Sequence, residues 1–334
     1  MVIMQKLREW MLPLAMTLGA SLYLIYHSLP QLHAAGPFLE KSVGVLQPML
    51  IFSMLFLTFC KIEPGELRPH RWHWWLLLIQ GGLFTAIGAA VAVAGRHIHA
   101  GHSEWLVLAE SAMLCLICPT ATAAAVVTRK LGGDVAGITS YTILINMLTA
   151  VLVPLVVPFV QPVEGMDFAV AFCMIVAKIF PLLIMPCLCA WLVRYLLPKV
   201  HSALLGYSDL PFYIWAVSLT LAIAVTTKSI VHSKMGVPML LLIAMVSLVC
   251  CVFQFAMGRF VGSRYGRRRG RHSRRITAGQ SLGQKNTVFA IWMGYTFMTP
   301  ETAIVGGMYS IWHNLYNSWQ LARAEKNNGA CEEE

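Results

Sequence analysis

The sequence predicts an all-α membrane protein with about ten transmembrane helices. Of the 334 residues, 57% are hydrophobic and only 12% are charged, which is about half the charge density of a soluble globular domain. The mean hydropathy is +0.66. At roughly 20 apolar residues per spanning helix, a chain of this length holds about ten helices joined by short loops. No substantial length of chain remains for a separate soluble domain.

Ten apolar runs are the candidates for these spans. The first run follows Lys6 and Arg8 but lacks a small-residue cleavage site that leads into a soluble domain, so a first span is favoured over a signal peptide. The predicted spans cover residues 11–29, 43–60, 72–94, 105–128, 135–160, 168–197, 211–231, 237–258, 276–298 and 301–322.

The basic residues orient the spans. Nineteen of the 25 Lys and Arg lie at the two termini and in the loops after even-numbered spans, four lie in the opposite loops, and Lys178 and Lys285 lie inside spans. Because cytoplasmic loops are enriched in Lys and Arg, both termini are predicted to be cytoplasmic, in a multi-pass protein of the bacterial inner membrane. The net charge of +10 is then a topology signal, and no nucleic-acid partner is expected.

The densest basic run covers residues 258–275. Such a run could bind anionic lipid or nucleic acid. The favoured interpretation is a solvated cytoplasmic loop that follows the positive-inside rule.

Spans 4 and 9 are interrupted at matching positions. Residues 118–123 (CPTATA) contain Pro119, which removes a backbone donor and clashes with the preceding turn. Residues 277–286 contain Gly279, Gly283 and several polar side chains. Broken helices at corresponding positions of two inverted halves indicate a transporter site near the middle of the membrane. The alternative is that Pro119 only kinks a packed helix and that the two glycines form a packing face.

These positions predict two inverted five-helix repeats, because a repeat with an odd number of spans must invert its copy. Residues 1–162 form the first repeat, with spans 1 to 5, and residues 163–326 form the second, with spans 6 to 10. Residues 327–334 form a polar C-terminal tail.

Four stretches of the sequence resemble the bile acid:sodium symporter family, and the resemblance covers most of the chain. They are residues 118–123, residues 128–134 (TRKLGGD), residues 283–286 (GQKN) and, most specifically, residues 310–315 (SIWHNL), which are close to the family's S-x-W-H-N pattern. The resemblance implies that broken helices 4 and 9 cross in a core domain, with spans 1, 2, 6 and 7 in a separate panel domain. It also implies sodium-driven, alternating-access transport of a small organic anion such as a bile acid, pantoate or a 2-oxo acid.

The resemblance places the substrate near the crossing, at Thr122, Asn286 and His313, with Asn314 beside them. A hydroxyl, an amide and an imidazole can all donate hydrogen bonds to a carboxylate. The positive ends of half-helices would add a favourable potential.

The family's sodium ligands are largely lost. Ala124 and Ala125 stand where the family has Ser-Asn, Ser281 replaces the carboxylate shared by two sodium ions, and Lys285 replaces a Gln. The predicted ion-coupling residues are Lys285, Ser281, Gln284, Gln80, Thr142 and Glu110.

Lys285 argues against sodium coupling through the usual sites. Two like charges 4 Å apart repel by about 4 kcal/mol even at an effective dielectric of 20. We hypothesise that the Lys285 ammonium occupies a sodium position, bonds to exposed carbonyls and could carry a proton, which predicts a proton-coupled or facilitative carrier. Alternatively, Lys285 snorkels or pairs permanently with Glu110, which could also pair with Lys178 or act as a proton relay.

The rival function is a non-transporting membrane sensor that binds an organic anion. No His-Glu-x-x-His or Gly-x-Ser-x-Gly motif is present, so an enzyme is not expected. No cofactor, metal or obligate protein partner is expected beyond the lipid bilayer and the anion, and binding of a sodium ion stays open.

Overall fold

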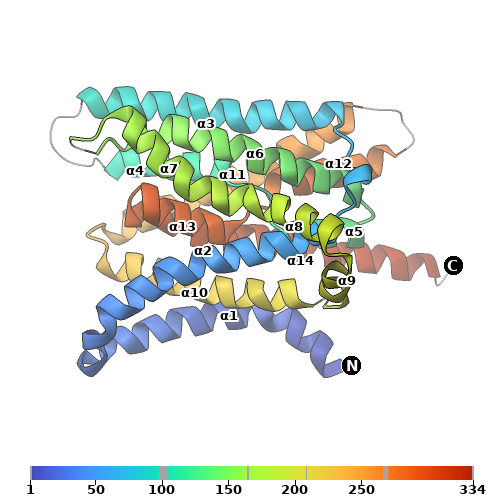
Figure 1. Ribbon diagram of the computed structural model, residues 1–334, viewed down its shortest axis with the longest axis horizontal. Helices are drawn as coiled ribbons and strands as arrows, with labels where there is room; N and C mark the ends of the chain where they lie inside the picture. The colour runs from blue at the N-terminus through green and yellow to red at the C-terminus, as the bar shows by residue number, and fades with distance from the viewer. Residues whose placement is uncertain (1, 98–103, 164, 208, 266–269, 333–334) are drawn as a thin grey trace.

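The computed structural model describes residues 2–97, 104–163, 165–207, 209–265 and 270–332, and this part of the chain is almost entirely helical (Figure 1). Within it, six helical segments are long and apolar enough to cross a membrane by themselves. They are Pro30–Cys60, Arg71–Gly95, Val135–Val160, Phe168–Leu196, Leu210–His232 and Val237–Arg264. The all-α membrane fold class is therefore confirmed. Six of the ten predicted spans correspond to these long apolar helices.

The other four predicted spans correspond to helices of different character. Two are continuous: α1 (Val2–Ser28) and α14 (Pro300–Glu332). The region of span 4 contains α4 (Glu104–Ile117) and α5 (Ala124–Lys130), and the region of span 9 contains α12 (Arg271–Gly283) and α13 (Thr287–Phe297). Each of these four pieces is too short to cross a bilayer alone.

Some element boundaries differ from the sequence prediction. The region of span 6 is divided into α7 (Phe168–Leu183) and α8 (Met185–Leu196), because Pro181 and Pro186 each remove a backbone donor near the junction. An unpredicted short helix, α9 (Pro198–Gly206), follows. The C-terminal segment predicted as a polar tail continues α14 as far as Glu332.

Two groups of helices pack around the broken segments. In one group, α2 (Gly36–Cys60) contacts α7, α8 and α10 (Leu210–His232), and α10 contacts α1. In the other group, α3 (Arg71–His97) contacts α4 and α6 (Val135–Val160), while α11 (Val237–Arg264) contacts α4, α12 and α14. Figure 1 shows α1, α10 and α2 along one edge and α3 and α6 along the opposite edge, with α13 and α14 between them.

Both ends of the chain lie at the same end of the molecule, together with α5 and α9 (Figure 1). This arrangement agrees with an even number of crossings.

Helices α11 and α12 lie in very close contact. A Cβ atom at Gly258 would lie 2.3 Å from the carbonyl oxygen of Ala278, and one at Gly262 would lie 2.5 Å from that of Arg274. This Gly-x-x-x-Gly pattern is typical of membrane helices whose backbones touch. A Cβ at Gly283 would lie 2.4 Å from the Phe255 ring, so the packing role considered for this glycine is also present.

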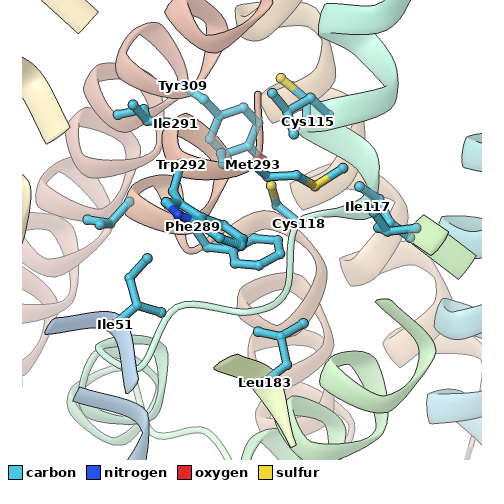
Figure 2. Packing of buried hydrophobic residues seen from close by; sticks show 14 of the residues in the cluster. Ile51, Cys115, Ile117, Cys118, Leu183, Phe289, Ile291, Trp292, Met293 and Tyr309 are labelled. Atoms are coloured by element: carbon cyan, nitrogen blue, oxygen red, sulfur yellow. The ribbon is translucent and has the colours of Figure 1, made fainter. Parts of the chain in front are cut away.

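The broken end of α4 is enclosed by an apolar core. Figure 2 shows Cys115, Cys118 and Tyr309 around Met293, and all four side chains belong to one buried cluster. In such surroundings a backbone carbonyl has no water to bond, so its partners must come from other side chains.

Candidate binding site at the helix breaks

The two interruptions meet as short extended segments. Thr120 and Lys285 form an isolated antiparallel bridge. On either side, the Ala121 N–H donates to Gln284 O at 2.9 Å and the Asn286 N–H donates to Pro119 O at 2.8 Å. Irregular backbone within a membrane protein must find such partners inside the protein. The segment between α4 and α5 and the segment between α12 and α13 are therefore in direct contact with each other.

The carbonyl oxygens at the C-terminal end of α4 are bonded one after another by side chains of other helices. Gln254 Nε2 donates to Cys115 O at 3.3 Å, Lys285 Nζ to Leu116 O at 3.3 Å, Thr149 Oγ1 to Ile117 O at 3.0 Å, and Gln80 Nε2 to Ile117 O at 3.2 Å and Cys118 O at 3.0 Å. The last carbonyls of a helix have no partner within the helix, and they carry the negative end of its dipole. This pole therefore attracts a cation.

Lys285 contributes a side-chain amine to this pole. Its side chain is 1% exposed, and none of the described carboxylates forms an ion pair with it. An isolated buried ammonium is strongly disfavoured unless other groups stabilise it. Here the stabilising group that the structure provides is the carbonyl pole of α4, one turn from the break.

The other predicted ion-coupling residues fall into two groups. The Gln80 amide donates to the end of α4 while its Oε1 accepts from Tyr141 Oη at 2.9 Å, and Thr142 Oγ1 donates to Ile138 O at 2.9 Å. These two side chains are engaged within the protein. By contrast, Ser281 Oγ and Gln284 Oε1 are buried without a hydrogen-bond partner.

Glu110 is buried but does not pair with either intramembrane lysine. Its carboxylate accepts from Thr302 Oγ1 at 2.9 Å and from Gln161 Nε2 at 2.7 Å. Lys178 instead lies over the Phe297 ring, with Nζ 5.6 Å from the ring centroid. The permanent ion pair considered from the sequence is therefore wrong for both lysines. Glu110 lies in α4, nine residues before Pro119. It is therefore separated from Lys285, which lies at the break.

Two of the four predicted substrate residues keep buried hydrogen-bonding groups without a partner. Asn286 caps α13, with Oδ1 accepting from the Phe289 N–H at 3.2 Å, while its Nδ2 is unpartnered. His313 is 4% exposed, and its Nδ1 has no partner. Thr122 lies partly buried in the break before α5. Asn314 is also partly buried, but its Nδ2 donates to Ser310 O in its own helix at 2.7 Å.

Sequence reasoning missed the side chains that bond the end of α12. Tyr309 Oη donates to Gly283 O at 2.8 Å, and Thr120 Oγ1 donates to Ser281 O at 2.7 Å. Two hydroxyls therefore bond this end, whereas a lysine amine bonds the end of α4. Gln254, which also bonds Tyr309 Oη at 3.1 Å, was missed too, although an amide in such an apolar span is a detectable signal.

A row of buried polar side chains runs between α12 and α14. Gln280 Nε2 donates to Asn317 Oδ1 at 3.0 Å, and Gln320 Nε2 lies 3.5 Å from the same oxygen. His313, Asn317 and Gln320 are spaced four and three residues apart, so they share one face of α14. Gln280 Oε1 and Asn317 Nδ2 have no partner. Buried polar groups of this kind require a ligand or ordered water.

Comparison with known proteins gives one family. The family model described as the SBF-like CPA transporter family matches residues 13–325, which include both breaks and all the candidate residues above. The search of the curated proteins finds no match.

Proposed function

The chain belongs to the SBF-like CPA transporter family, related to the bile acid:sodium symporters, and from that premise we propose that it carries a small organic anion across the membrane by alternating access. The observation that carries the proposal is the buried Lys285 ammonium at the carbonyl pole of α4, where two interrupted segments meet. Fixed positive charge at a helix break in a membrane protein favours a site for an anion and its coupling ion.

The cargo belongs to the class of small carboxylates, such as bile acids, pantoate or 2-oxo acids. A carboxylate needs hydrogen-bond donors when it leaves water. Asn286 Nδ2 is a buried donor without a partner, and His313 Nδ1 is a buried ring nitrogen that can donate in one tautomer. Thr122 lies in the facing break, and Asn314 follows His313. These four residues form the proposed substrate site.

Transport proceeds without sodium at the usual positions. The Lys285 ammonium already supplies positive charge at the end of α4, and a sodium ion beside it would be repelled. The Gln80 and Thr142 oxygens are engaged within the protein. The carrier is therefore facilitative or proton-coupled, with Lys285 in the place of an ion.

The helices divide into two inverted repeats, residues 1–162 and 163–326. Helices α4/α5 and α12/α13 are the two discontinuous spans that cross within a core domain. The group formed by α1, α2, α7, α8 and α10 is the panel domain against which the core moves. Both termini face the cytoplasm of a bacterial inner membrane, since 19 of the 25 basic residues belong to that side.

Asn286→Ala and His313→Ala are expected to remove anion binding, because each deletes a buried group available to a carboxylate. In detergent, a carboxylate that raises the unfolding midpoint of the wild-type protein should cause less than a tenth of that shift in either variant. His201→Ala is the matched control, since this histidine of α9 is buried and its Nε2 bonds Cys60 O at the end of α2. It should lower the midpoint without ligand but keep the ligand-induced shift.

Counterflow of the stabilising carboxylate in proteoliposomes then separates transport from sensing. The proposal requires exchange of labelled for unlabelled anion at equal rates in sodium and in choline. Binding without exchange would instead establish the sensor, and exchange only in sodium would contradict the role given to Lys285.

A further inference from the structure

A large groove lies between α11, α12 and α14, and none of the proposed substrate or ion residues lines it. Its volume is about 1320 Å³, whereas small-molecule pockets typically have roughly 300–1,000 Å³. Its walls include Val252, Phe255 and Phe260 of α11 with Leu315, Tyr316 and Trp319 of α14. We call it the α11–α14 groove.

One end of the groove is basic. Arg259 of α11 and Arg271, His272 and Arg275 of α12 all line it, and no acidic residue is among the described residues that do so. Arg271 is the first residue of α12, so the positive end of this helix adds to the same potential. The basic end therefore favours an anionic group, while the walls favour an apolar one.

The length of the groove matches one leaflet of a bilayer. Along α11 the lining extends from Leu248 to Ser263, which is about 22 Å at 1.5 Å per residue. Half of a bilayer that is roughly 40–45 Å thick with its headgroup regions is about 20–22 Å. Arg259 lies 5.5 Å from the centroid of the Tyr316 ring, and the Trp319 ring stacks on Tyr316 at 5.7 Å, so both aromatic side chains lie toward the basic end. Such side chains are enriched at the membrane interface. Leu315 and Phe260 are 65% and 53% exposed, so the groove opens at the protein surface.

We propose that the α11–α14 groove binds an anionic phospholipid of the leaflet next to the two termini. Its phosphate lies among Arg259, Arg271 and Arg275, and one acyl chain lies along α11 and α14. A small soluble anion would not cover the long apolar wall of the groove. A nucleic acid would leave the same wall exposed to water. Only an amphipathic anion satisfies both the charge and the wall.

Quenching of tryptophan fluorescence by brominated lipids tests this assignment with the full chain in detergent micelles. Phosphatidylglycerol with brominated acyl chains should quench the wild-type protein at lower mole fraction than brominated phosphatidylcholine does. Trp312 and Trp319 both line the groove, so the additional quenching should be lost in the W312F/W319F variant. The Arg271→Gln/Arg275→Gln variant should bind phosphatidylglycerol about thirty-fold more weakly.

The matched control is Arg129→Gln/Lys130→Gln, which removes the same charge from two exposed residues at the end of α5, outside the groove. It should change phosphatidylglycerol binding by less than two-fold. Equal quenching by the two lipids, equal weakening in the control, or displacement of the lipid by a soluble carboxylate would each overturn the proposal. All four residues changed to Gln are exposed, so their variants should remain monodisperse.

Discussion

Lys285→Met is expected to reduce the initial rate of anion counterflow at least one-hundred-fold, while the protein remains folded. Methionine has a similar length but no charge, so the carbonyl pole of α4 loses its cation. The unsatisfied Leu116 carbonyl costs about 1–3 kcal/mol, and removal of a buried ammonium offsets much of that loss. The unfolding midpoint in detergent should therefore stay within a few degrees of the wild-type value.

Lys178→Met is the matched control for this change. Lys178 is the other intramembrane lysine, and it lies over the Phe297 ring. Its replacement should leave counterflow within about two-fold, because no role in the cycle is assigned to it. If Lys285→Met transports as well as Lys178→Met, Lys285 is not part of the mechanism.

Lys285→Gln tests whether a dissolved sodium ion can replace the positive charge of Lys285. The amide can donate to Leu116 O, but it leaves the pole without a positive charge. A sodium ion can then approach, so counterflow should be absent in choline and partly restored in sodium. Equal activity of this variant in the two salts would contradict the idea that Lys285 stands in the place of an ion.

Gly258→Leu is expected to abolish accumulation of folded protein. Adding carbon atoms to a packed core typically costs about 1–3 kcal/mol. At this position the Cβ would lie 2.3 Å from the backbone oxygen of Ala278, which cannot rotate away as a side chain could. Helix α12 would have to separate from α11, and the end of α12 would move with it.

Gly82→Leu is the corresponding control, because nothing lies within 4 Å of a Cβ at this helical position. After extraction in detergent, size-exclusion chromatography should show a monodisperse peak for Gly82→Leu and little or none for Gly258→Leu. A stable, monodisperse Gly258→Leu protein would show that the α11–α12 contact is not required for folding.

The sequence predicts the helices well because their determinants are local. Apolar length marks the spans, and Pro119 and Gly283 mark positions where helices α4 and α12 stop or pack closely. These features need only the chemistry of neighbouring residues and the requirement that membrane backbone be satisfied.

The partners of the buried polar groups could not be predicted in the same way. Gln254 bonds a carbonyl 139 residues away in the chain, and Thr302 bonds Glu110 across 192 residues. Such pairs depend on how helices rotate and slide against each other, which the hydrophobic pattern of one span does not specify. The division into inverted repeats, the substrate residues and the coupling mode stay predictions.

The ammonium at the end of α4 has a thermodynamic consequence. A dissolved ion that binds on one side of a membrane and leaves on the other delivers about 2.3 kcal/mol per charge for each 100 mV of potential. In the proposed carrier cycle Lys285 returns to its starting position each time because it is covalently attached, so its charge delivers no net electrical work. Because Lys285 is part of the chain, its presence at the end of α4 does not depend on the salt concentration. A carrier built on Lys285 alone would bring its cargo to equilibrium across the membrane, and accumulation would require a proton or a second solute that actually crosses.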